Sequence, residues 1–140
     1  MKAVGMLGVA LLLAAAAPGA VPQTAGQLKV TVDYRGAGTV DGTHEVFVWL
    51  FDTPDITVDS VPLAQEVVTK NGTTLSFSGL PKEVYMAAAF DETGEYDGTA
   101  GPPPPGSPVR IYGESGVAAA ILTGAEAAIT MTFDDSTRMP

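Results

Sequence analysis

The stretch LSFSGLPKEVYMAAAFD, residues 75–91, decides the fold. Leu75 and Phe77 alternate with serines, and this period of two is typical of a strand with one buried and one wet face. The following Gly-Leu-Pro predicts a turn. Residues 84–90 then run almost without a polar break, so they predict a second, centrally buried strand whose small alanines let another layer approach closely.

Strand patterns continue on the N-terminal side of this stretch. Residues 28–35 alternate most cleanly between apolar and polar side chains. Residues 45–52 contain the continuous apolar run VFVWLF, which suits a central strand covered on both faces. Between them, the glycines of residues 36–43 indicate turns. The sheet therefore has at least one strand buried on both sides.

The segment between residues 52 and 75 gives weaker signals for secondary structure. Residues 53–62 hold prolines and aspartates, so we expect a loop or edge connection there. The dipeptide Asn71-Gly72 separates two modest strands, residues 65–70 and 73–78, and is the strongest short signal for a β-hairpin. We therefore predict that these two strands pair with each other.

The C-terminal part predicts two more strands. Residues 116–122 form one, residues 123–125 a turn, and residues 129–133 the closing strand with alternating apolar positions. A helix over residues 117–128 is the alternative, but Gly124 cuts that run into pieces too short to be stable alone. About seven strands separated by turns predict one all-β domain over residues 26–140, an antiparallel Greek-key sandwich.

Residues 75–91 also resemble part of the transthyretin-like and carboxypeptidase-regulatory-like sandwich domains, and of related exported bacterial domains of unknown function. In those families an aromatic residue precedes a Gly-Leu-Pro turn, and a tyrosine opens the next strand, which ends in an acidic loop. Phe77, Tyr85 and the loop from Asp91 take these places. The resemblance implies a transthyretin-like (prealbumin-like) fold but no site residues. A hormone-carrying or hydrolytic relative would need a histidine-rich site, whereas His44 is the only histidine.

The first twenty residues have the order of a secretory signal peptide. Lys2 is followed by an uncharged, largely apolar run that passes into small residues before Pro18 and Gly19. This predicts cleavage between residues 16 and 25 and export to the periplasm or the outside of the cell. A retained anchor is the alternative, but a membrane-spanning helix needs about 20 apolar residues, so we expect no stable membrane insertion after cleavage.

Composition excludes several classes of partner and anchor. The chain has a net charge of −9, with seven basic and sixteen acidic side chains. Nucleic acids and anionic membrane surfaces would repel it. It contains no cysteine, so neither disulfides nor a lipid-modified cysteine can hold it. The domain must depend on its hydrophobic core for stability.

The loop after residue 90 holds the densest group of potential metal ligands. Asp91, Glu92, Glu95 and Asp97 lie within seven positions, and calcium prefers several carboxylate and carbonyl oxygens. The spacing does not fit an EF-hand, because Tyr96 stands where that motif needs glycine. An irregular calcium site and a plain acidic surface turn therefore both stay open, and no other cofactor is expected.

The same loop continues into a proline-rich segment up to Pro108. Four consecutive prolines favour a stiff polyproline II segment, which either docks into a partner's aromatic groove or packs across the sandwich on a tyrosine. The candidate partner-binding residues are Tyr96, Pro102, Pro103, Pro104, Pro105 and Tyr112.

No catalytic constellation stands out in the sequence. His44 reads as a solvated turn residue, and no Gly-x-Ser-x-Gly elbow, zinc-type histidine pair or cysteine nucleophile accompanies it. A hydrolase using the paired carboxylates Asp91 and Asp97 is the weakest hypothesis, since nothing nearby predicts a dehydrated carboxyl group. We therefore predict a non-enzymatic exported module that binds an unknown protein or extracellular ligand or has a structural role, with a calcium-binding protein as the alternative.

Overall fold

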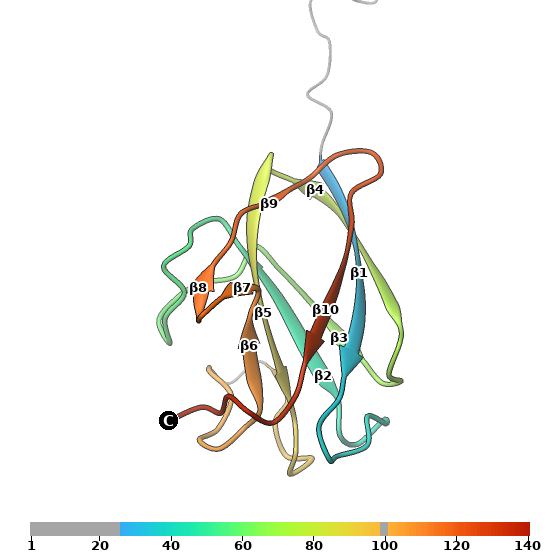
Figure 1. Ribbon diagram of the computed structural model, residues 1–140, viewed down its shortest axis with the longest axis vertical. Coiled ribbons are helices and arrows are strands. Elements are labelled where there is room, and N and C mark those ends of the chain that lie inside the picture. The colour runs from blue at the N-terminus through green and yellow to red at the C-terminus, as the bar shows by residue number, and fades with distance from the viewer. Residues whose placement is uncertain (1–25, 99–100) are drawn as a thin grey trace, which may run out of the picture.

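Two β-sheets packed face to face, with a small third sheet of two short strands, make up the protein in the computed structural model, which describes residues 26–98 and 101–140 (Figure 1). One sheet has the strand order β10-β1-β4, and the other has the order β3-β2-β5-β6, with β9 also beside β5. The strands are β1 (Gly26–Tyr34), β2 (Val46–Phe51), β3 (Ala64–Val68), β4 (Thr74–Leu80), β5 (Glu83–Phe90), β6 (Val109–Ile111), β7 (Gly113–Glu114), β8 (Val117–Ala118), β9 (Ile121–Leu122) and β10 (Ala128–Phe133). The predicted all-β sandwich is confirmed.

The predicted signal peptide, residues 1–20, and its cleavage range, residues 16–25, lie outside the described residues. Within the part that the structure describes, no helix is long and apolar enough to cross a membrane.

The main core lies between the two sheets and follows from the period-two pattern. In β1, Leu28, Val30, Val32 and Tyr34 are all buried and face the second sheet. Tyr34 stacks on Phe90 of β5, with their ring centroids 4.3 Å apart. Because alternate residues of a strand point to opposite faces, the polar residues of β1 stay on the outside.

Strand β2 is buried on both faces, as its unbroken apolar run predicts. Val46, Val48 and Leu50 point into the core between the sheets. The intervening aromatic residues, Phe47, Trp49 and Phe51, form a second buried cluster on the outer face of the same sheet.

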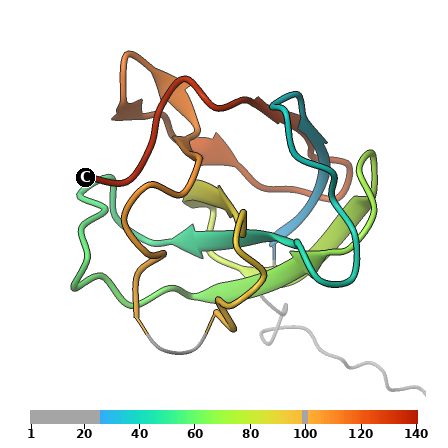
Figure 2. The same cartoon turned by 90° about the horizontal axis from the view of Figure 1, so that it is seen from below.

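The alanines of β5 make room for this outer cluster. Ala87 lies opposite Trp49 and Ala89 opposite Phe47 in the antiparallel register of β2 and β5. Small side chains beside the large rings let two loops, residues 53–62 and the described residues between 91 and 108, cover this face of the sheet (Figure 2). The close layer expected from the alanines is therefore made of loops.

The hairpin predicted at Asn71-Gly72 is wrong. Strand β3 pairs with β2 and strand β4 pairs with β1, so the turn carries the chain from one sheet to the other. The physical reason is the Asn71 amide, which accepts a hydrogen bond from the Tyr34 N–H (2.8 Å) and donates one to the Tyr34 carbonyl (2.7 Å). The Asn71 side chain therefore bonds to the end of β1, and the turn does not close a hairpin between β3 and β4.

The C-terminal part differs from the predicted single strand over residues 116–122. Two short strands replace it: β8 pairs with β7, and β9 pairs with β5. Gly113 and Gly116, both with positive φ, bend the chain around this small hairpin. No helix forms over residues 117–128, and β6, which the sequence analysis missed, extends the second sheet.

The closing strand β10 lies at the predicted place but runs parallel to β1, in register from Lys29–Ala128 to Tyr34–Phe133. All other strand pairs are antiparallel. The chain leaves the second sheet after β9 and crosses over the end of the sandwich before it enters β10 (Figure 1). That crossing gives β10 the same direction as β1.

Candidate functional site

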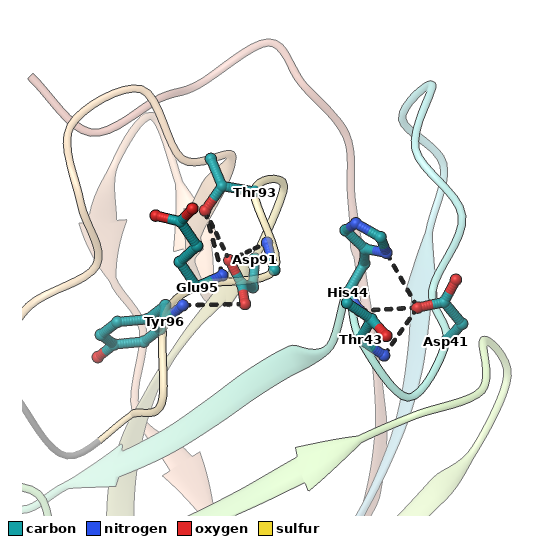
Figure 3. A network of polar contacts seen from close by, with 8 residues as sticks. Asp41, Thr43, His44, Asp91, Thr93, Glu95 and Tyr96 are labelled. Atoms are coloured by element: carbon teal, nitrogen blue, oxygen red, sulfur yellow. Dashed lines mark hydrogen bonds and ion pairs between the residues drawn. The ribbon is translucent and has the colours of Figure 1, made fainter.

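Asp91 organises the acidic loop from within. Its side chain is 2% exposed, and its two oxygens accept hydrogen bonds from the backbone N–H groups of Gly94 (3.0 Å) and Tyr96 (3.2 Å). The Thr93 hydroxyl donates a third bond, of 3.3 Å (Figure 3). This carboxylate therefore stabilises the turn that follows β5, in the manner of a capping residue.

Two other acidic residues of the loop, Glu92 and Glu95, have contacts of their own. Glu92 forms an ion pair with Arg138 at 3.0 Å, which raises the pKa of Arg138 and ties the loop to the C-terminal segment. Glu95 is exposed, and its backbone N–H donates to the Thr93 hydroxyl. Among residues 26–98 and 101–140, no group of three or more histidine, aspartate or glutamate side chains is placed to hold a metal ion.

A second turn, which contains His44, holds a separate group of hydrogen bonds near the acidic loop (Figure 3). Asp41 accepts hydrogen bonds from the backbone N–H groups of Thr43 (2.9 Å) and His44 (2.7 Å), and these bonds lower the pKa of its carboxyl group. The His44 ring lies 3.0 Å from the same carboxylate. A β-carbon added to Gly94 would come within 2.9 Å of Thr43, so the two turns are in close contact.

Tyr96 anchors the proline-rich segment on the outer aromatic cluster. Its ring meets Phe47 edge-on at a centroid distance of 4.9 Å, and it lies 6.3 Å from Trp49. Its hydroxyl donates a 2.6 Å hydrogen bond to the Gly101 carbonyl. Burial of the ring, with Asp97 and Asp91 nearby, raises the pKa of Tyr96.

The predicted partner-binding residues separate into groups. Pro102 and Pro103 lie beside the outer cluster, next to the Tyr96 anchor. Pro104 accepts a backbone hydrogen bond from Ser107 (3.2 Å), so it begins a turn that includes Pro105. Tyr112 lies elsewhere and packs against the core between the sheets.

A groove of about 440 Å³ opens between the two loops that cover the outer face of the second sheet. Its floor is formed by Trp49, Phe51 and Ala87. One wall consists of residues 56–58 and 60–62, which we call the valine wall, and the other of residues 101–103, which we call the proline wall. Met139, near the C-terminus, also lines the groove.

The valine wall exposes apolar surface that the fold does not need. Val58 is 62% exposed and Val61 is 83% exposed, whereas Trp49 on the floor is only 8% exposed. The indole N–H of Trp49 donates to the Gln65 side chain (2.9 Å), which fixes the ring at the base of the groove. A concave, largely apolar site with a few fixed polar groups is the usual form of a ligand-binding pocket.

The sequence analysis missed the valine wall because residues 53–62 read only as a connecting loop. The available signal was Ile56, Val58 and Val61, three apolar residues within an otherwise polar, proline-containing segment. Their role depends on Trp49 and Pro102, which come from distant parts of the chain.

No protein-family model and no curated protein matches this chain. Among solved structures, a pilus-presented adhesin, Spy0125 (Cpa), is similar over 81% of the chain, with 17% sequence identity and a TM-score of 0.32. The chain spans 27% of the length of that adhesin. A similarity this low does not place the protein in the adhesin's family, nor do these comparisons place it in the transthyretin-like or carboxypeptidase-regulatory-like families.

Proposed function

We propose that the protein is an exported, non-enzymatic binding module that holds an apolar group of its ligand in the groove between the valine wall and the proline wall. The observation that carries the proposal is the exposure of Val58 and Val61 beside an aromatic floor, on a chain with a net charge of −9. Contiguous apolar surface on an otherwise charged, soluble domain marks a site of interaction.

The architecture supports this assignment in two further ways. The floor lies on β2 and β5, the two central strands of the sheet, so it is rigid. The proline wall is held in place by the Asp91 and Tyr96 hydrogen bonds, and the valine wall by hydrogen bonds between Thr57 and Ser60. A volume of about 440 Å³ falls within the range of small-molecule sites and also accommodates one or two apolar side chains of a protein partner.

The role expected for the acidic and proline-rich loop changes in this proposal. Asp91, Glu92 and Tyr96 position the loop, and within this loop only the proline wall contacts the ligand. The carrier and adhesion roles found among transthyretin-like modules are compatible with such a groove, and kinship with that family is part of the proposal.

Binding of the neutral naphthalene dye prodan tests the proposal. Trp49 is the only tryptophan in the chain and lines the groove, so dye bound there should quench its emission by energy transfer. Val61→Asp, which places a charge on the valine wall, should weaken binding at least tenfold. The matched control Val117→Asp changes a similarly exposed valine (70%) that does not line the groove, and it should bind like the wild type. Equal effects of the two substitutions would refute the groove as the site.

A further inference from the structure

Strand β4 lies at an open edge of the first sheet, and its backbone groups are available for pairing. Val32 of β1 exchanges backbone hydrogen bonds with Thr73 and Gly72, whereas Lys29 donates to Ala127 on the other side. Even-numbered residues of β1 therefore bond toward β4 and odd-numbered ones toward β10.

The same alternation shows which residues of β4 direct their backbone groups away from the sheet. Leu75 and Phe77 lie opposite Val30 and Leu28, so they bond to β1. Thr74 and Ser76, between these positions, direct their N–H and C=O groups away from the sheet. Within the part of the chain that the structure describes, no strand pairs with that side of β4.

This edge has a bulge near its C-terminal end, where the register with β1 shifts between Phe77 and Leu80, but it lacks the other features that usually prevent strands from associating. The sequence of β4, TLSFSGL, contains no charged residue and no proline, although the chain as a whole is strongly acidic. Exposed edges are normally blocked by charges, proline or a covering segment. At the edges of the second sheet, β3 carries the exposed Glu66, and the C-terminal segment covers the outer side of β6, where Val109 donates to Thr137 (2.9 Å).

The sequence of β4 is also complementary to itself. In an antiparallel pair of β4 strands centred on Ser76, Leu75 meets Phe77 of the second copy on the core side. On the wet side Ser76 meets Ser76, and Thr74 meets Ser78. Hydroxyl pairs of this kind are favourable across strands, and the protein already contains one, because the hydroxyls of Thr31 and Thr74 lie 2.8 Å apart on neighbouring strands.

The other open edge of the same sheet does not share this property. An antiparallel pair of β10 strands from two copies, centred on Thr130, would place Glu126 of one copy opposite Asp134 of the other. Like charges directly opposite each other destabilise a strand pair. In this register the two edges of the sheet therefore differ, and β4 suits a two-fold pairing better than β10.

We propose that β4 pairs antiparallel with β4 of a second copy, which joins the two first sheets into one continuous sheet across a two-fold axis. This interface is separate from the groove, which lies on the outer face of the second sheet. An interface built mainly on one strand edge is smaller than the roughly 1,200 Å² of a stable complex, so the dimer is weak. Repulsion between two acidic copies opposes it, and added salt therefore strengthens it.

Sedimentation velocity from micromolar to millimolar protein tests this pairing. The wild type should shift toward a dimer with concentration, and more strongly at high salt. Ser76→Lys places a charge on the β4 edge and should keep the protein monomeric. Thr130→Lys is the matched control, since Thr130 is an exposed residue of the other edge strand, and it should dimerise like the wild type. A wild type that stays monomeric, or equal behaviour of the two variants, would overturn the proposal.

Hydrogen exchange of the wild type gives a second readout that needs no substitution. The amides of Thr74 and Ser76 should exchange more slowly at high than at low protein concentration, whereas the Thr130 amide at the β10 edge should not change. Concentration-independent exchange at Thr74 and Ser76 contradicts the pairing even if Ser76→Lys fails to fold.

Discussion

Replacing Asp91 with alanine should lower the free energy of unfolding by about 3 kcal/mol. The carboxylate is buried and accepts two backbone hydrogen bonds, from Gly94 and Tyr96. A hydrogen bond to a charged group contributes about 1.5–3 kcal/mol, and we take the lower value for each because both bonds are at least 3.0 Å long. The substitution also leaves both donors without their acceptor. Asp91→Asn keeps one acceptor oxygen and should cost roughly half as much.

Urea unfolding followed by the fluorescence of Trp49 measures this change, since Trp49 lies 6.3 Å from the Tyr96 ring that the loop holds in place. Glu95→Gln is the control in the same loop, because the Glu95 side chain is exposed; it should change the stability by less than about 0.5 kcal/mol. The reasoning is refuted if Asp91→Ala costs less than about 1 kcal/mol, or if its cost appears only when calcium is present.

Three further predictions concern the turns and the charges. Asn71→Ala removes both hydrogen bonds to the Tyr34 backbone and should destabilise the protein by about 2 kcal/mol in thermal unfolding; an unchanged midpoint would contradict the cross-sheet role of the turn. The pKa of Asp135 is lowered by the Ala37 N–H and then by the Tyr34 hydroxyl, so its stabilising contribution is complete above the unfolded pKa of about 4 and is lost as the pH falls through the folded value. Asp135→Asn should therefore show a shallower loss of stability between about pH 4 and about pH 2, and parallel curves for the two proteins would speak against this. Chelator and excess calcium should give the same melting temperature, because the Asp91 oxygens already accept hydrogen bonds; a site at a hundred times its dissociation constant would instead add about 2.7 kcal/mol.

Strands with a one-sided or fully apolar pattern could be predicted from the sequence. In β1 and β2 the burial follows directly from the residue order, because a period of two assigns every side chain to a face. The alanines of β5 also indicated correctly that a further layer approaches the sheet. Which side chains of a strand are buried depends on the residues of that strand itself, so the sequence pattern was sufficient to predict it.

Pairing partners were not predictable in the same way. Asn71-Gly72 has the composition of a hairpin turn. Which strands the turn connects depends on the partner of the Asn71 amide, and that partner is the backbone of Tyr34, which is far away in sequence. The direction of β10 likewise depends on the crossing that precedes it. A single sequence does not carry such long-range information.

The candidate site could be predicted only in part. The segment from Asp91 to Pro108 stood out by composition, and the structure places its Tyr96 and Pro102 beside Trp49. The opposite wall was missed, because Val58 and Val61 become significant only when the fold brings them to the other side of the same aromatic floor.

Intermolecular nuclear Overhauser effects between bound prodan and the methyl groups of the protein test the central claim most directly. If the groove is the binding site, the dye should show contacts to the methyl groups of Val58, Val61 and Met139, all of which line it. Val117 and Leu122 are similarly exposed but lie outside the groove, and they should show none. Contacts to Val117 or Leu122 without contacts to Val61 would contradict the account.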